Sequence, residues 1–116
     1  MRRGDVVLVQ VPFVGNPGAK VRPALIVQND ALNKVLKETI IAAITSNLGH
    51  MHQPQQFFVD VSTPEGIATG LLTNSAIRCD RLQSVPQSDI RKVIGRLSGA
   101  QLAEVNKSLK SALAIP

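Results

Sequence analysis

The chain has 116 residues, 44% of them apolar, which is enough for one globular domain over residues 1–116 and too short for two. It carries 13 Lys and Arg against 8 Asp and Glu, and this net charge of +5 indicates an anionic partner such as nucleic acid or an acidic peptide. Its single cysteine excludes an intramolecular disulfide and a cysteine-based zinc site. Because no stretch approaches the about 20 apolar residues of a membrane span, and the first apolar run is too short for a signal sequence, we expect a cytoplasmic protein without membrane contact.

The first half of the chain is expected to be rich in strands. The segment 24–28 is short, apolar and β-branched, which is typical of a strand buried on both faces. Pro23 should open this strand because proline has no N–H for the hydrogen-bond ladder. Further strands are expected over residues 6–11, 39–44 and 56–61, with one or two helical turns over 31–36.

The second half is expected to mix strands and helices. The pattern predicts a turn over 63–66, strands over 67–72 and 76–82, and a short helix over 86–93. The clearest helix is at the C-terminus, where Ser98 and Gln101 form a capping-box pattern. Leu102, Val105 and Leu109 repeat at helical spacing after it, which indicates a helix docked on a sheet.

A first candidate site is expected around Arg22. The following proline forces Arg22 into an extended conformation, and a guanidinium on a restrained backbone is well suited to hold a phosphate. The connection of about ten residues to the strand over 39–44 permits antiparallel pairing. That pairing would place Arg22 beside Thr45 and Ser46, so that guanidinium and hydroxyl donors surround an anion. The alternative is a solvated arginine at a strand edge.

A second candidate is the segment Arg78-Cys79-Asp80. Residues two apart in a strand face the same way, so Arg78 and Asp80 should share one face while Cys79 points into the core. The alternation breaks at Arg81-Leu82, where the strand should bulge or end. The alternatives are a surface ion pair between Arg78 and Asp80 and a merely structural, buried Cys79.

Other chemistries have weaker support in the sequence. His50 and His52 lie in a polar loop without a convincing third ligand, so no metal and no cofactor are expected, although this loop could touch RNA. There is no glycine-rich phosphate loop and no nucleophile elbow. Phe57 and Phe58 are adjacent in a strand, so at most one should face a ligand.

Five short motifs stand out along the chain: Arg3-Gly4-Asp5-Val6, Arg22-Pro23-Ala24-Leu25-Ile26-Val27 with Asn29-Asp30, Ala43-Ile44-Thr45-Ser46, Arg78-Cys79-Asp80 and Ile94-Gly95-Arg96-Leu97-Ser98. They stand in the order seen in the MazF/PemK toxins of type II toxin–antitoxin systems, and the chain resembles this family over nearly its whole length. The resemblance implies an SH3-like small β-barrel (PemK/CcdB-like) with a C-terminal α-helix and a homodimer. It also implies metal-independent, sequence-specific cleavage of single-stranded RNA, as by an mRNA interferase, and inhibition by a cognate antitoxin whose acidic tail occupies the RNA groove.

By this resemblance Arg22 and Thr45 match the catalytic arginine and threonine, while Arg78 and Asp80 match a second pair with catalytic or substrate-binding roles. The chain departs from the family where many members carry a Gly-His-Glu-Gln-like stretch, since it has Gly15-Asn16-Pro17-Gly18-Ala19 there. It also has Arg81 where many members have glutamine.

The leading hypothesis is therefore an endoribonuclease toxin in which the RNA 2′-hydroxyl attacks the adjacent phosphate. Arg22 and Thr45 would stabilise the developing charge, and Asp80 is the more natural base because arginine stays protonated. The alternative is a non-catalytic binding module on the same barrel, either a CcdB-like topoisomerase poison or a degenerate toxin. The intact pair of Arg22 and Thr45 favours the enzyme. RNA-binding roles are predicted for Lys20, Ser46, Asn47, Arg78 and Arg81.

Overall fold

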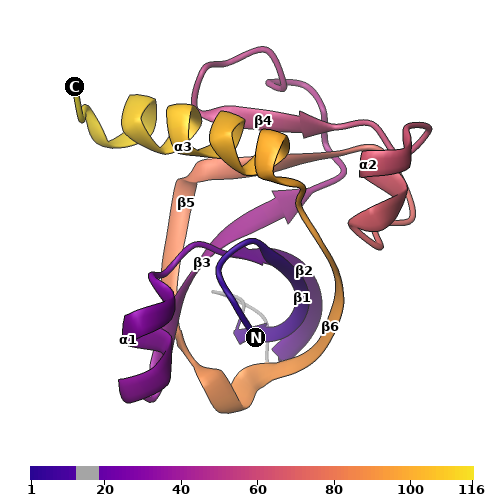
Figure 1. Cartoon of the computed structure of the whole chain (residues 1–116). Coiled ribbons are helices and arrows are strands. Elements are labelled where there is room, and N and C mark those ends of the chain that lie inside the picture. The colour runs from indigo at the N-terminus through magenta and orange to yellow at the C-terminus, as the bar shows by residue number, and fades with distance from the viewer. Residues whose placement is uncertain (13–18) are drawn as a thin grey trace.

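The computed structural model describes residues 1–12 and 19–116. Six antiparallel strands form one sheet in the order β4-β5-β3-β2-β1-β6. The sheet curls around itself, and the C-terminal helix α3 (Gly99–Leu113) lies across β4 and β5 (Figure 1). This confirms a mainly β, barrel-like fold with a C-terminal helix, in which the edges β4 and β6 are not paired with each other. The strands are β1 (Asp5–Pro12), β2 (Ala19–Ile26), β3 (Glu38–Thr45), β4 (Gln56–Val59), β5 (Ser75–Pro86) and β6 (Ile90–Arg96).

The helices begin at local capping residues. Asn29 caps α1 (Asp30–Val35) by accepting a hydrogen bond from the Ala31 N–H. The predicted capping box of α3 is present, since the Ser98 hydroxyl accepts from the Gln101 N–H and the Gln101 side chain accepts from the Ser98 N–H. No helix in the described part of the chain is long and apolar enough to cross a membrane.

The sheet buries both of its faces. One face packs against α3 in a core cluster that includes Leu25, Ile77 and Val105. The other face forms a second cluster inside the curl, which includes Ala24 and Ile26. Because neighbouring residues at the end of β2 belong to different clusters, residues 24–26 of this strand are buried on both faces, as the sequence predicted.

Three sequence-based expectations about the elements are wrong. Pro23 lies inside β2, opposite Leu8 of β1. The pairing of β2 with β3 extends only from Ala24 to Ile26, so Pro23 faces an open edge where a missing N–H is tolerated.

The other two wrong expectations are the strand over 67–72 and the helix over 86–93. Thr63 caps a short helix, α2 (Pro64–Ala68), and no strand follows it: Leu71 is partly buried against the core, while Leu72 is 99% exposed. The segment 86–93 contains a 3₁₀ turn over Gln87–Asp89 and then β6, which pairs with β1. In both places tertiary packing outweighs the local pattern.

Candidate active site

Strand pairing places the predicted site residues on one face of the sheet. Directly paired residues point to the same face, as do residues two apart along one strand. One row of paired residues crosses β2, β3, β5 and β4 through Ala24, Ala43, Arg78 and Gln56. Arg22 lies two residues before Ala24 on β2, and Thr45 lies two residues after Ala43 on β3. Because these strands are antiparallel, Arg22 and Thr45 lie on the same side of this row.

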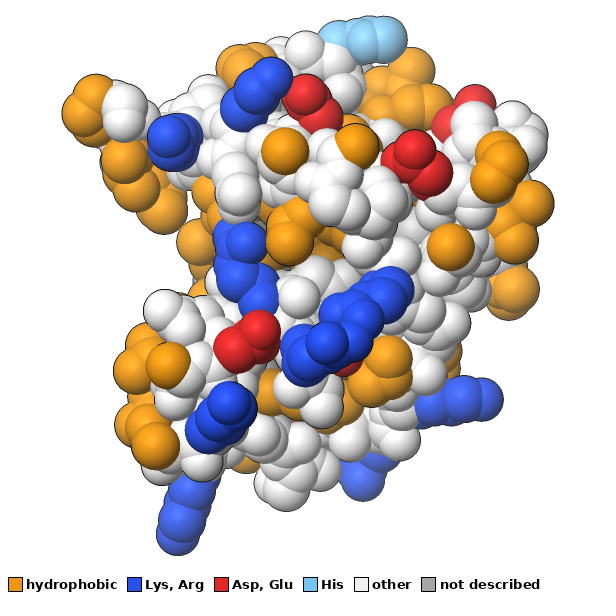
Figure 2. All heavy atoms as spheres, in the orientation of Figure 1, with side chains coloured by type: hydrophobic (Ala, Val, Ile, Leu, Met, Phe, Trp, Pro, Cys, Tyr) orange, Lys and Arg blue, Asp and Glu red, His pale blue; other side chains and the backbone are white. Residues whose placement is uncertain are grey.

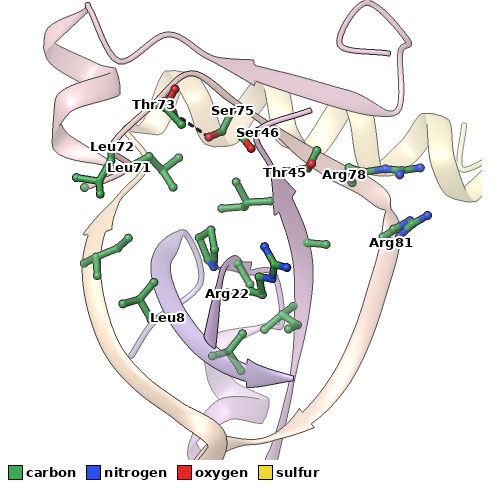
Figure 3. A pocket seen from close by; sticks show the side chains of 18 of the residues that line it. Leu8, Arg22, Thr45, Ser46, Leu71, Leu72, Thr73, Ser75, Arg78 and Arg81 are labelled. Carbon is green, nitrogen blue, oxygen red and sulfur yellow. Dashed lines mark hydrogen bonds between the residues drawn. The ribbon is translucent and has the colours of Figure 1, made fainter. Parts of the chain in front are cut away.

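A cavity of about 1000 Å³ opens over this face, opposite the face that carries α3. Figure 3 shows Arg22 projecting from β2 below Thr45, with Arg78 and Arg81 on the β5 side. The other side of the cavity is apolar and is formed by Leu8, Leu71 and Leu72. The cavity is therefore amphipathic, with its cationic and hydroxyl groups gathered along β2, β3 and β5.

The Thr45 hydroxyl is oriented by the turn that follows β3. Its Oγ1 accepts a hydrogen bond from the Asn47 backbone N–H at 3.0 Å. Since this bond occupies the oxygen as an acceptor, the hydroxyl hydrogen is available for donation to another group. Thr45 lines the cavity, so it can act there as a neutral donor beside the guanidinium groups.

Arg78 and Asp80 form a bidentate ion pair. The Arg78 Nη2 lies 2.8 Å from Asp80 Oδ2, and Nε lies 3.2 Å from Oδ1. The hydrogen bonds from Arg78 lower the pKa of Asp80 and the same contact raises the pKa of Arg78. Asp80 is thus a weak base that holds Arg78 in place, and its predicted position on the same face as Arg78 is confirmed.

The cavity brings together five of the eight predicted site residues. A second, smaller cavity shares Thr45 and Arg78 with the first one and also contains the predicted Asn47. Lys20 and Asp80 line neither cavity, although Lys20 lies two residues before Arg22 on β2. The five residues of the large cavity are Arg22, Thr45, Ser46, Arg78 and Arg81.

The expectations for the neighbouring residues are also decided by the structure. Cys79 is fully buried, and burial raises the pKa of its thiol to about 11. The register of β5 against β3 shifts between Arg78 and Leu82, which is the bulge that the broken alternation predicted. Phe57 packs against the core under α3, which leaves Phe58 on the opposite face. The departure at residues 15–18 lies outside the described residues.

Two residues that were not among the predicted site residues belong to the site region. Gln56 and His50 line the smaller cavity with Thr45, Asn47 and Arg78, and only the loop of His50 had been linked to RNA. The position of Gln56 at the start of a predicted strand carried no sign of its partner, Arg78 of β5. In the described part of the chain, no three His, Cys, Asp or Glu side chains come close enough together to hold a metal ion.

The surface charge agrees with an anionic ligand. Figure 2 shows Lys and Arg side chains spread over the viewed face, with fewer acidic side chains between them. The curled sheet and the basic cavity define a small, mainly β protein that is suited to hold an anionic chain. The chain matches the family model described as "PemK-like, MazF-like toxin of type II toxin-antitoxin system" over residues 2–113, and it belongs to this family.

Similar proteins are consistent with this membership. The chain is 28% identical to the endoribonuclease MazF of Staphylococcus saprophyticus over 116 residues, which cover 99% of this chain and 92% of the relative. It is 31% identical to the endoribonuclease PemK of Escherichia coli, with 84% of this chain and 80% of the relative covered. The fold superposes on the Mycobacterium tuberculosis toxin MazF-mt6 with a TM-score of 0.79 at 22% identity, covering 97% and 98% of the two chains.

Proposed function

We propose that this chain is the toxin of a type II toxin–antitoxin pair and that it cleaves single-stranded RNA as a metal-independent, sequence-specific endoribonuclease. The observation that carries the proposal is the meeting of Arg22, Thr45 and Arg78 from three strands at one open cavity. The family membership and the endoribonuclease names of the relatives support the same reaction. They favour it over a non-catalytic module on the same barrel.

In this proposal the RNA supplies its own nucleophile. The 2′-hydroxyl attacks the adjacent phosphorus, the bond to the 5′-oxygen breaks, and the products end in a 2′,3′-cyclic phosphate and a 5′-hydroxyl. Negative charge gathers on the non-bridging oxygens in the transition state, where Arg22 and Arg78 attract it and Thr45 donates a hydrogen bond. Ser46 and Arg81 line the same cavity and contact the neighbouring RNA backbone. Asn47 extends the binding surface into the smaller cavity, and Lys20, two residues before Arg22 on β2, adds positive charge nearby.

The role of Asp80 follows from its ion pair. A carboxylate with a lowered pKa accepts a proton poorly, and both of its oxygens are engaged by Arg78. We therefore assign Asp80 first to the positioning of Arg78. Asp80 can take the proton of the 2′-hydroxyl only when a bound phosphate draws Arg78 away from it.

The test of the reaction uses two RNA oligonucleotides that differ by one oxygen. One contains the cleaved sequence, and the other has a single 2′-deoxy sugar at the scissile position; both are incubated with the protein in EDTA. We expect cleavage of the first only, with a cyclic phosphate among its products. Cleavage of the deoxy substrate at the normal rate would exclude the 2′-hydroxyl as nucleophile. A long single-stranded RNA that stays uncut under the same conditions would exclude ribonuclease activity.

The partners belong to the same proposal. A mycobacterial endoribonuclease of similar fold has been solved with its cognate antitoxin, with a TM-score of 0.78 at 22% identity. For this chain we propose an antitoxin whose acidic tail covers the basic side of the cavity, in the cytoplasm where RNA is available. Its binding should weaken as salt rises, since part of the attraction is screened.

We also propose that the chain acts as a two-fold homodimer. Apolar side chains remain exposed on α1 and at the start of β3, including Leu32, Val35 and Ile40, and a second copy would cover such surface. Analytical ultracentrifugation at micromolar concentration should give about twice the mass of the chain. A monomer there would remove this part of the proposal.

A further inference from the structure

The smaller cavity lies directly beside the cationic groups of the larger one. Thr45 and Arg78 line both cavities, while Asn47, His50 and Gln56 line the smaller one only. Its volume of about 40 Å³ admits the polar edge of a planar ring but not a whole nucleotide. A group in the smaller cavity would therefore belong to a ligand whose anionic part contacts Thr45 and Arg78.

Gln56 is the unusual residue of this cavity. It is only 8% exposed, and its side-chain Oε1 is buried without a hydrogen-bond partner among the described residues. Its backbone is held by a hydrogen bond from its N–H to the Gln53 carbonyl and by pairing with Arg78 across β4 and β5. A buried acceptor without a hydrogen-bond partner costs about 1–3 kcal/mol relative to a satisfied one, so its presence at a cavity wall is better explained by a ligand than by folding.

Asn47 complements Gln56 on the same cavity. Its Oδ1 accepts from the Gly49 N–H at 3.0 Å, which fixes the amide and leaves its NH₂ group for donation. Two side-chain amides at one cavity offer a donor and an acceptor, which is the pattern that reads the edge of a nucleobase. The exposed imidazole of His50 at the same cavity provides a flat surface on which a base can stack.

We propose that the smaller cavity is a nucleobase-specificity site, in which the side-chain amides of Gln56 and Asn47 hydrogen-bond to the edge of one base of the RNA. The inference rests on the proposed ribonuclease function. The shared residues Thr45 and Arg78 put this base next to the phosphate that is cleaved. Sequence preference at one position beside the cut would then depend on two amides that contact no phosphate.

The test measures cleavage preference position by position. Wild-type protein, Gln56→Leu, Gln56→Glu and the control Gln53→Leu are incubated with an RNA pool that is randomised around the cleaved site, and the products are sequenced. Leucine keeps the size of the side chain but removes both hydrogen-bonding groups. Glutamate keeps the acceptor and removes the donor, so it should favour the bases that present an amino group (adenine, cytosine and guanine) over uracil. Gln53 is an exposed amide three residues earlier that lines neither cavity.

We expect Gln56→Leu to reduce the preference at one position beside the cut by roughly 5- to 100-fold, with the other positions unchanged. Gln56→Glu should shift the preference at that same position, and Gln53→Leu should match the wild type. A profile that is unchanged in both Gln56 variants, or reduced equally at every position, overturns the inference and means that the cavity holds only water.

The same experiment separates this inference from the proposed function. A wild-type chain that cuts RNA while both Gln56 variants keep its profile refutes the specificity site alone. A wild-type chain that cuts no RNA refutes the ribonuclease and the specificity site together. Because leucine removes an unsatisfied buried acceptor, Gln56→Leu should fold at least as stably as the wild type, and thermal unfolding by circular dichroism verifies this.

Discussion

Replacing Thr45 by valine tests the proposed role of its hydroxyl most directly. Valine has nearly the same shape as threonine, so the end of β3 should keep its packing while the cavity loses one donor. Loss of a single donor to a developing oxyanion costs about a hundred- to a thousand-fold in rate, which is about 2.7–4 kcal/mol of transition-state stabilisation. We therefore expect Thr45→Val to lower the rate of RNA cleavage by this factor, and Thr45→Ser to stay within about tenfold of the wild type.

The effect on folding should be much smaller, and the structure shows why. Thr45 Oγ1 accepts one hydrogen bond, from the N–H of Asn47, and Asn47 is exposed so that water can replace the lost acceptor. The net cost of such a bond is about 1 kcal/mol, which lowers the Tm of a domain of this size by about 4 °C. The rate of RNA cleavage should thus fall by at least about a hundredfold, while the Tm falls by only about 4 °C.

The assay is single-turnover cleavage of a fluorescent RNA oligonucleotide, with thermal unfolding followed by circular dichroism on the same preparations. Thr73→Val is the matched control, because Thr73 is an exposed threonine that lines the same cavity away from the arginines. A Thr45→Val protein that cuts within tenfold of the wild type would refute the donor role. A loss of similar size in Thr73→Val would mean that any change at the cavity wall impairs the reaction.

Three further outcomes are expected. Asp80→Asn should slow cleavage about tenfold without abolishing RNA binding. Because the ion pair with Arg78 lowers the pKa of Asp80, the stabilisation of the fold by this pair should be complete above about pH 4 and should disappear as acid protonates the folded carboxylate. Thermal unfolding at a series of pH values can follow this loss. Cys79 is fully buried with its pKa raised to about 11, so a thiol reagent at pH 8 should label it only in denaturant. Gly95→Ala should destabilise the fold by at least about 2 kcal/mol in urea unfolding, since a Cβ there would lie 2.3 Å from the Ala68 carbonyl oxygen.

The sequence predicted the fold class, and five of the eight residues that it proposed for the site line one cavity, because both depend on local patterns. The alternation of Ile77, Arg78 and Cys79 assigned each side chain to a face, and the structure keeps that assignment. The short connection between β2 and β3 predicted their antiparallel pairing, and with it the approach of Arg22 to Thr45. The resemblance to the toxin family then supplied a function for this cluster of residues.

The misassigned elements depend on contacts that are distant in sequence. The segment 90–96 becomes a strand through its pairing with β1, more than 80 residues earlier in the chain. The segment 67–72 looks like a strand in the sequence, yet Thr63 as helix cap and Gly70 with its φ of 75° give the backbone a different path. Gln56 was overlooked for the same reason, because its significance comes from Arg78, a partner on another strand.

The alternation of faces along the strands explains why binding and catalysis can be separated in this site. In β3 the odd residues Ala43 and Thr45 line the cavity, while Ala42 and Ile44 belong to the core cluster under α3, and of these two only Ile44 also borders the cavity. A shift of one residue in this pairing would exchange the two sets and bury the hydroxyl of Thr45 in the core. The same row continues to Gln56 at the edge strand β4, so the proposed phosphate contacts and the proposed base contacts lie on one rigid surface at a fixed spacing. Sequence preference can therefore change at Gln56 on β4, while the reacting groups remain held by β2, β3 and β5.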